Sequence, residues 1–291
     1  MMRSLLFVPA DSEKKLARGL GSGADALIVD LEDSVALANK EAARRLAAEF
    51  IASAKDGPRL YVRVNDLSTG LTDDDLAAVM KAGPAGIMLP KSNSSEDVAR
   101  LGVRLRVHEA ENGIADGATR IIPIITETPG AVLNAASYAG ASARLAGLTW
   151  GAEDLSAEIG AAATRDEDGR YTDVFRFARI STVLGACAAE VAPIDTVFPD
   201  FRNEAGFLRD TREGARDGFT GRMAIHPAQV AVINEVFTPT AEAVAQARAV
   251  VAAFAAAGNP GVVAIDGKMY DRPHLKRAER LLARAGPVRA S

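Results

Sequence analysis

Acidic side chains follow short apolar runs at several places in this chain. Glu127 and Asp154 follow two successive runs, and Asp30, Glu32 and Asp33 follow an earlier one. Carboxylates gathered at one place repel each other unless a cation lies among them or some are protonated. Because the chain has three histidines and hard oxygen donors favour Mg²⁺ or Mn²⁺ over zinc, Glu127 and Asp154 are candidate Mg²⁺ ligands. The alternative is that one or both begin the helix that follows.

Arg63 lies close to the end of another apolar run. Its planar guanidinium suits a bidentate clamp on a carboxylate, which makes it a candidate substrate-binding residue. A salt bridge to nearby acids is the alternative. Asp30, Glu32 and Asp33 could order metal-bound water and position Arg63, or they could form a polar loop in which Asp33 caps a helix.

A parallel barrel would bring these residues together. Eight apolar runs alternate with eight amphipathic stretches, which favours parallel strands joined by helical crossovers. Eight such units in about 235 residues are typical of a (β/α)₈ TIM barrel, whose active site lies at the carboxyl ends of the strands. An open doubly wound sheet is the alternative, although no G-x-G-x-x-G turn follows the first strand. The predicted strands are 4–8, 26–30, 60–64, 86–89, 120–125, 143–148, 194–198 and 222–225, and the predicted helices are 13–20, 40–54, 72–81, 95–111, 129–138, 173–190, 204–217 and 227–236.

The chain changes character after the eighth unit. We expect an alanine-rich helix at 241–257, a turn at 259–261, a strand at 262–266 and a basic helix at 272–285. Residues 1–237 are therefore predicted to form the barrel, and residues 238–291 a C-terminal helical lid or arm.

Composition and charge exclude several classes of protein. The net charge of −4 offers no footprint for nucleic acid, which needs a basic face. A single cysteine, Cys187, excludes a disulfide framework within the chain and a thiolate zinc site; it lies in an apolar helical stretch and is expected in the core. No apolar run is long enough for a membrane span or a signal peptide, so a cytoplasmic location is expected.

An ordered set of short motifs identifies a family. The chain resembles the citrate lyase β-subunit-like proteins of the HpcH/HpaI aldolase/citrate lyase superfamily over nearly its whole length. The motifs that carry the resemblance are R-S-L-L-F-V-P at residues 3–9, A-D-A-L-I-V-D-L-E-D-S-V at 24–35, V-R-V-N at 62–65, L-P-K at 89–91, T-E-T-P-G-A at 126–131, G-A-E-D-L at 151–155, I-H-P-A-Q at 225–229 and A-I-D-G-K-M at 264–269.

The resemblance implies roles for individual residues. Glu127 and Asp154 match the two protein ligands of Mg²⁺, and Arg63 matches the arginine that holds the substrate carboxylate. Asp266 matches a catalytic acid on the C-terminal arm that, in relatives, reaches the active site of a neighbouring subunit. That implies a homo-oligomer, a trimer or a multiple of one. From the residues alone, Asp266-Gly267 is also a favoured turn pair.

The resemblance also implies contacts with coenzyme A (CoA). His226-Pro227 and the bases of the first helix match regions that contact the CoA part of the substrate. Relatives often carry a glycine and an early arginine after the first strand, which this chain lacks. The phosphate contacts would then fall to Lys14, Lys15 or Arg18, for which a solvated helix face is the alternative.

The resemblance therefore implies that the chain is a Mg²⁺-dependent carbon–carbon lyase. The expected substrate is a malyl-CoA or citramalyl-CoA type thioester, cleaved to acetyl-CoA and a 2-oxo acid, with Asp266 handling the proton on the acetyl α-carbon. The alternatives are a malyl-CoA thioesterase, an acyl-carrier-dependent citrate lyase β subunit, an HpaI-type 2-oxo acid aldolase and a non-catalytic protein that binds oxo acids or CoA. The sequence does not separate the thioesterase from the lyase.

Overall fold

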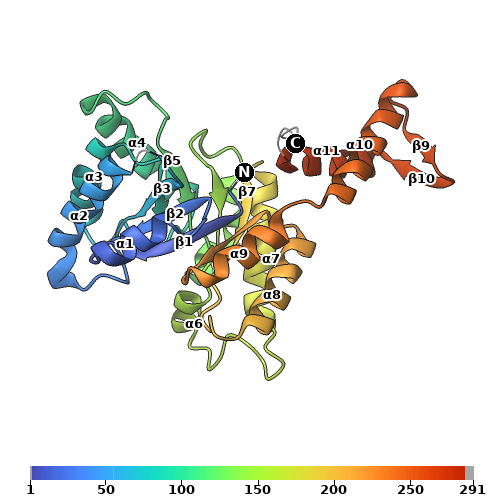
Figure 1. The fold of residues 1–291 in the computed structure, drawn as a ribbon. Coiled ribbons are helices and arrows are strands. Elements are labelled where there is room, and N and C mark those ends of the chain that lie inside the picture. Colours follow the sequence, from blue (N-terminus) through green and yellow to red (C-terminus); the bar gives the residue numbers. More distant parts are fainter. Residues whose placement is uncertain (1, 55, 286–291) are drawn as a thin grey trace. The chain divides into compact units, whose positions relative to one another are not determined.

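The structure, a computed structural model, describes residues 2–54 and 56–285. These residues form two compact units, Met2–Asn234 and a C-terminal unit that begins at Glu235 (Figure 1). The sequence-based boundary between residues 237 and 238 lies three residues further along the chain. Among the described helices, none is both long and apolar enough to cross a membrane.

The first unit is built on eight parallel strands in the order β5-β4-β3-β2-β1-β8-β7-β6. Parallel bridges between Ile121 and Leu145 and between Ile124 and Thr149 join the two outer strands of this list. The ring therefore closes, which confirms the predicted (β/α)₈ barrel and excludes the doubly wound alternative. The strands are β1 (Ser4–Pro9), β2 (Ala26–Asp30), β3 (Arg59–Arg63), β4 (Gly86–Leu89), β5 (Arg120–Pro123), β6 (Gly147–Leu148), β7 (Ala192–Asp195) and β8 (Gly221–Ala224).

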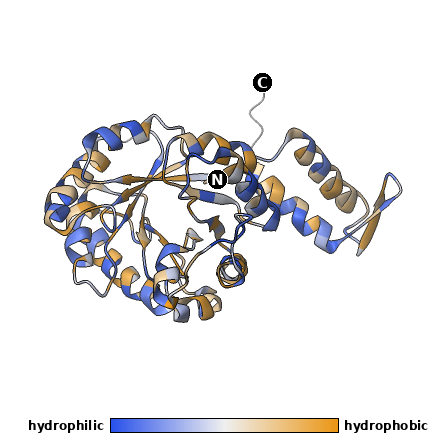
Figure 2. Ribbon diagram, turned by 90° about the horizontal axis from the view of Figure 1, so that it is seen from below, coloured by the Kyte–Doolittle hydropathy of each residue, from blue (hydrophilic) through white to orange (hydrophobic). Residues whose placement is uncertain are grey.

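Apolar side chains on both faces of the strands explain the closed ring. Leu5, Ile28 and Met223 belong to one buried cluster inside the barrel, while the alternate residues of β2, such as Leu27, are equally buried. Strands with two buried faces need helices on the outside, and Figure 2 shows hydrophobic strands surrounded by helices that carry hydrophilic stretches. The helices of this unit are α1 (Glu13–Leu20), α2 (Lys40–Ser53), α3 (Thr72–Val79), α4 (Ser95–Glu111), α5 (Pro129–Leu133), α6 (Glu153–Ile159), α7 (Asp173–Ala188) and α8 (Glu204–Asp217), and α9 (Ala228–Phe237) continues past its end.

The barrel departs from the sequence-based prediction between β5 and β7. The predicted helix 129–138 is divided into α5 and a 3-10 turn at Ala135–Tyr138. The seven-residue helix α6 is not among the eight predicted helices, although the sequence offers a helix start at Asp154 as an alternative to a metal ligand. Cys187 is exposed, so its predicted place in the core is wrong. It lies on α7, whose outer face also exposes Phe177 and Leu184.

As far as residue 285, the C-terminal unit consists mainly of two helices and a hairpin. Helices α10 (Ala241–Ala256) and α11 (Arg272–Ala285) pack around Phe254 and Leu275, and β9 (Val262–Ile265) pairs antiparallel with β10 (Lys268–Asp271). The hairpin turn consists of Asp266 and Gly267, both with positive φ, as two-residue hairpin turns with Asp-Gly require. The second strand of this hairpin was not predicted.

Candidate active site

A cavity of about 430 Å³ opens at the carboxyl ends of the barrel strands. Its polar lining consists mainly of acids and one arginine, and the rest of its wall is largely apolar. The polar groups include Asp30, Asp33, Arg63, Glu127, Glu153 and Asp154, and the apolar wall includes Phe7, Ile124, Trp150, Tyr171, Val197 and Met223. The barrel thus gathers the acids and the arginine that the sequence singled out.

Arg63, at the end of β3, is held by the acids that follow β2. Its Nε and Nη2 donate to the two carboxylate oxygens of Asp30 at 2.7 Å each, and its Nη1 lies 3.0 Å from Glu32 Oε2. Burial pushes the pKa of Asp30 upward, but the hydrogen bonds and charge of Arg63 lower it below its ordinary value. Asp33 is more distant, with Oδ2 3.5 Å from Nη1, and precedes a loop and a 3-10 turn instead of capping a regular helix.

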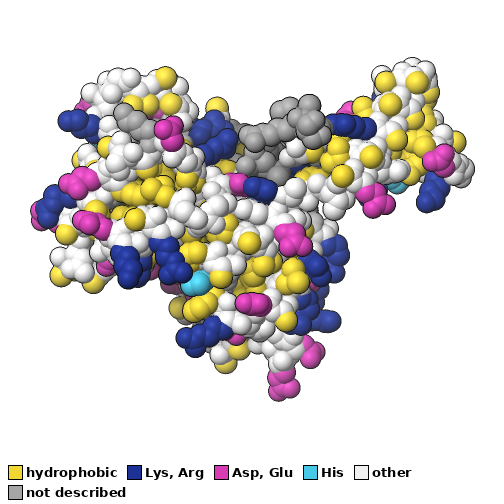
Figure 3. Space-filling view, in the orientation of Figure 1, with side chains coloured by type: hydrophobic (Ala, Val, Ile, Leu, Met, Phe, Trp, Pro, Cys, Tyr) yellow, Lys and Arg dark blue, Asp and Glu magenta, His cyan; other side chains and the backbone are white. Residues whose placement is uncertain are grey.

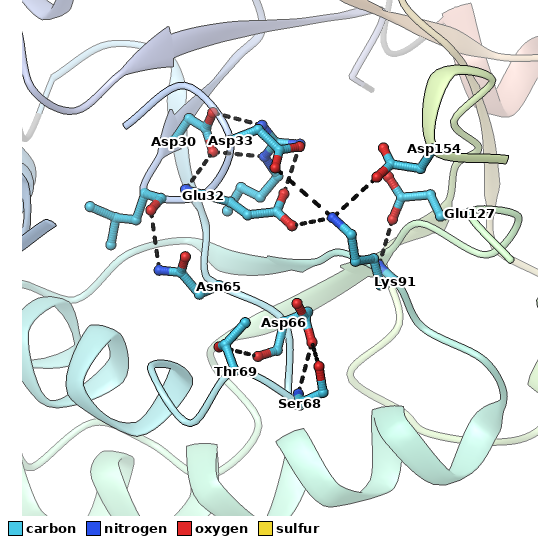
Figure 4. A network of polar contacts seen from close by, with 12 residues as sticks. Asp30, Glu32, Asp33, Asn65, Asp66, Ser68, Thr69, Lys91, Glu127 and Asp154 are labelled. Carbon is cyan, nitrogen blue, oxygen red and sulfur yellow. Dashed lines mark hydrogen bonds and ion pairs between the residues drawn. The ribbon is translucent and has the colours of Figure 1, made fainter. Parts of the chain in front are cut away.

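Lys91, in the turn after β4, contacts acids from three different segments (Figure 4). Its Nζ lies 2.6 Å from Glu32 Oε1 and 3.3 Å from Asp154 Oδ1. Its backbone N–H donates to Glu127 Oε2. Lys91 has a φ of +50°, a conformation that non-glycine residues seldom adopt. The sequence alone predicts no role for Lys91, because these contacts depend on that turn.

Glu127 and Asp154 lie at the cavity rim, after β5 and in the first turn of α6. Asp154 does not cap that helix, whose N-cap is Ala152. Burial, and after it the charge of Asp154, raises the pKa of Glu127 to about 8. Burial likewise raises the pKa of Glu32 to about 7, although Arg63 and Lys91 oppose the shift.

The rim contains more negative than positive groups. Five carboxylates, those of Asp30, Glu32, Asp33, Glu127 and Asp154, contact or face Arg63 and Lys91. Among the described residues, no three His, Cys, Asp or Glu side chains form a group that could hold a metal ion by themselves. A cation bound to Glu127 and Asp154 would therefore take its other ligands from water or substrate.

A second cavity, of about 240 Å³, adjoins the first. The two share Phe7, Pro9 and Ile225 in their linings. The second is also lined by Lys15 and Arg18 of α1 and by the segment after β8, His226-Pro227. Figure 3 shows Lys and Arg side chains near a histidine on the face of the barrel that carries α1.

Two further predicted residues lie apart from these linings. Lys14 is exposed on α1 and lines neither cavity; the neighbouring Lys15 takes that place. Asp266 lies in the C-terminal unit, on the turn of its hairpin, where it is exposed.

A paired ion network lies behind the aromatic wall of the first cavity. Trp150 Nε1 donates to Asp195 Oδ1 at 2.8 Å, and Asp195 accepts from Arg179 Nη2 at 2.6 Å. Tyr171 packs edge-on against Trp150 at 5.0 Å between ring centroids, with the guanidinium of Arg165 3.6 Å above its ring. The sequence does not predict this network, because no local motif joins its members.

Comparison with known proteins places the chain in a family. The model of the HpcH/HpaI aldolase/citrate lyase family matches residues 3–227. Citrate lyase subunit beta of Escherichia coli K12 is 36% identical over 287 residues, which cover 97% of this chain and 93% of that protein. The human mitochondrial citramalyl-CoA lyase is 32% identical over 300 residues, 99% of this chain and 86% of that protein.

A solved structure supports the same assignment along the whole chain. The protein CitE from Mycobacterium tuberculosis, in complex with magnesium, acetoacetate and coenzyme A, superposes with a TM-score of 0.77 at 34% identity, covering 98% of each chain. The predicted family and the predicted carbon–carbon lyase class are thereby confirmed. This chain belongs to the HpcH/HpaI aldolase/citrate lyase family.

Proposed function

We propose that this protein is a Mg²⁺-dependent lyase that cleaves a 3-hydroxyacyl-CoA dicarboxylate into acetyl-CoA and a 2-oxo acid. The observation that carries the proposal is the acidic rim, where five carboxylates, Glu127 and Asp154 among them, face two cations beside a cavity that adjoins a basic one. Relatives named as lyases of citrate and citramalyl-CoA support it.

The rim fits a hard divalent cation. Glu127 and Asp154 would hold Mg²⁺, or Mn²⁺ in its place, because both offer only oxygen donors. The raised pKa of Glu127 reflects a buried carboxylate that a cation would stabilise in its charged form. When bound, the metal would supply Lewis-acid polarisation of the substrate oxygens.

Arg63 would bind the substrate carboxylate through Nη1. Its other two nitrogens are engaged by Asp30, which fixes the plane of the guanidinium. A substrate carboxylate would then compete with Glu32, which lies 3.0 Å from Nη1. Asp30 thereby orients Arg63, and Glu32 would give up its contact with Nη1 when the substrate binds.

The second cavity would take part of the CoA moiety. Lys15 and Arg18 offer positive charge for phosphate groups, and His226 offers a ring stacked on Phe201 with centroids 4.5 Å apart. Pro227 completes the wall. We include Lys15 in the proposed set, since Lys14 lines neither cavity.

The wall of the first cavity favours a substrate with an apolar substituent. The carbinol carbon of the substrate bears a hydroxyl, a carboxylate, the thioester arm and one further group. The first two would lie at the acidic rim and the arm would lead to the second cavity, which leaves the fourth group to Ile124, Trp150 and Met223. A methyl group there would contribute about 1 kcal/mol, whereas a second carboxylate would be buried without a partner. A citramalyl-CoA type substrate is therefore favoured over a citryl one.

Asp266 would transfer the proton at the acetyl α-carbon. In cleavage it would donate this proton to the enolate carbon as the 2-oxo acid leaves, and in condensation it would remove it. We propose that it does so from the arm of a neighbouring subunit in a homo-oligomer, a trimer or a multiple of one.

Mixed oligomers test the role of Asp266. Subunits carrying Asp266→Asn would be dissociated and reassembled with subunits carrying Glu127→Gln, each inactive alone. Action between subunits predicts that the mixture regains part of the turnover. No recovery in mixed oligomers would contradict it.

The other functions are separable by their products. A thioesterase would release free CoA without an oxo acid, and an acyl-carrier-dependent citrate lyase β subunit would ignore CoA thioesters. An aldolase of the HpaI type would use free oxo acids, and the second cavity would then have no CoA to bind. A non-catalytic binding protein would turn nothing over.

A cytoplasmic location remains a prediction.

The test of the proposed function is a coupled assay of 2-oxo acid release from malyl-CoA and citramalyl-CoA, with Mg²⁺ and with a chelator. We expect pyruvate and acetyl-CoA from citramalyl-CoA, abolished by the chelator, and slower release of glyoxylate from malyl-CoA. Release of free CoA without an oxo acid would show that the protein is a thioesterase and not a lyase. Inactivity on both thioesters would contradict the proposal.

A further inference from the structure

Lys91 contacts both proposed metal ligands, each through a different part of the residue. Its backbone N–H donates to Glu127 Oε2, and its ammonium lies 3.3 Å from Asp154 Oδ1. Arg63, the other cation at the rim, pairs with Asp30, Glu32 and Asp33 in the described structure. Lys91 therefore brings a positive charge directly to the proposed metal site.

The turn that carries Lys91 is fixed by its neighbours. Ser92, the next residue, donates its N–H to the carbonyl of Ile124 and is bonded through its hydroxyl to Tyr138. The left-handed backbone of Lys91, with φ +50°, is therefore held in place on one side. The amide contact with Glu127 belongs to this backbone, whereas the contact with Asp154 belongs to the side chain alone.

The ammonium and a divalent cation compete for the same carboxylate. Like charges a few ångströms apart in a partly buried site repel strongly, so an ammonium at 3.3 Å from Asp154 opposes a metal ion on that group. Lys91 has a partner to retain when it withdraws, because Glu32 lies 2.6 Å from its Nζ. Moving from Asp154 would therefore leave the ammonium paired.

We propose that Lys91 is a built-in counter-ion of the metal site. Its ammonium neutralises Asp154 while the metal is absent and withdraws to Glu32 when Mg²⁺ binds, so this side chain lowers the affinity of the site for the metal. Lys91 is thus a positioning residue, and this role rests on the proposed function of Glu127 and Asp154 as metal ligands.

Calorimetric titration of the full-length, chelator-treated protein with MgCl₂ tests this role without any turnover. Lys91→Met removes the charge and retains most of the chain length, and we expect it to bind Mg²⁺ at least ~10-fold more tightly than the wild type. Lys91→Arg keeps the charge and is expected to stay within about threefold of the wild type. Lys81→Met removes a charge from an exposed lysine outside the cavity lining and should change nothing.

A second variant separates the side chain from the backbone. Lys91→Gly suits the positive φ, keeps the N–H that Glu127 accepts, and also removes the ammonium. It should tighten Mg²⁺ binding as Lys91→Met does, which keeps the test valid if the methionine variant fails to fold. In the chelator both neutral variants should melt at a lower temperature than the wild type, because Asp154 loses its partner.

The outcomes distinguish this inference from the proposed function. Unchanged or weaker Mg²⁺ binding by Lys91→Gly, with normal 1:1 binding by the wild type, would overturn the role of Lys91 alone. Absence of Mg²⁺ binding by the wild type and by every variant would overturn the metal site and, with it, this inference.

Discussion

The barrel unit contains two clusters of charged side chains that differ in how their charges are balanced. Behind the aromatic wall, Asp195 and Asp210 each pair with an arginine at 2.6 Å, and the surrounding arginines lower the pKa of Asp210 to about 2 against the effect of burial. At the rim, Glu127 has a pKa raised to about 8 and Glu32 one raised to about 7. In the buried network each of these acids has a close arginine partner, whereas at the rim five carboxylates face only Arg63 and Lys91 among the described side chains.

This difference separates structural from functional charge. A paired buried network loses stability when one partner is removed. In a cluster whose carboxylates outnumber its cations, the carboxylates repel each other, and binding a further cation reduces this repulsion. The comparison predicts that mutations in the network act on stability, and that mutations at the rim act on metal binding and turnover.

The largest expected effect is on turnover. Asp154→Asn removes one of two proposed metal ligands, so kcat/KM for citramalyl-CoA should fall by at least ~10³-fold. The free energy of unfolding should stay within about 1 kcal/mol of the wild type, since Asp154 is partly exposed. Steady-state kinetics and urea unfolding of the same sample would check both. Retained turnover would show that this carboxylate holds no essential metal.

The network should respond in the opposite way. Arg222→Met removes the 2.6 Å partner of the buried Asp210 and leaves it with Arg165 at 3.0 Å, which should lower the free energy of unfolding by about 3 kcal/mol. Urea unfolding would measure it, with Arg216→Met, a change at an exposed arginine, as the control. A decrease in the free energy of unfolding of less than about 1 kcal/mol would show that the two clusters do not differ in their effect on stability.

The dependence of stability on pH should also differ between the clusters. The pKa of Glu127 is raised in the folded state, so its contribution to stability is complete below its ordinary pKa and is lost as pH rises through about 8. In chelator, the free energy of unfolding should therefore fall between pH 5 and pH 8, by up to about 1.4 kcal/mol per unit of pKa shift. Asp210, with its lowered pKa, gives the opposite sign and loses its contribution only as pH falls toward about 2.

Urea unfolding at a series of pH values, with chelator and with Mg²⁺, would measure this pH effect. Added Mg²⁺ should reduce the loss at high pH, because metal binding favours the deprotonated carboxylate. A Glu127→Gln variant should lack much of the slope between pH 5 and pH 8. An unchanged slope in that variant would assign the effect to other groups.

The smallest expected effect concerns the second cavity. Arg18→Ala removes one positive charge from a partly open wall, so KM for the acyl-CoA should rise several-fold, about 1 kcal/mol, with kcat unchanged. Lys14→Ala, on the same helix but outside both linings, is the matched control. Equal effects of the two changes would argue against a specific CoA contact.

The sequence predicts the barrel and most of the rim, for a physical reason. Strands that alternate with helices must pair in parallel, so residues such as Glu127 and Asp154 meet because each follows a strand. Lys91 also follows a strand, but its contacts with Glu127 and Asp154 depend on a left-handed turn that the sequence does not predict. The Trp150–Asp195 bond joins residues 45 positions apart and has no local signal.

The prediction of which helix residues are buried was wrong for part of one apolar helix. Helix α7 reads as a core helix, yet it exposes Phe177, Leu184 and Cys187. Hydrophobic periodicity identifies a helix but does not say which of two apolar faces is covered. Helix α6 is seven residues long, too short for periodicity to register.

The most direct test of the account is calorimetric titration of Mg²⁺ into the chelator-treated protein at pH 8, for the wild type and for the double variant Glu127→Gln/Asp154→Asn. We expect one Mg²⁺ per chain in the wild type and no measurable binding in the double variant, with the fold of both retained. Equal binding by the two proteins, or none by the wild type, would contradict the claim that the acidic rim is a metal site.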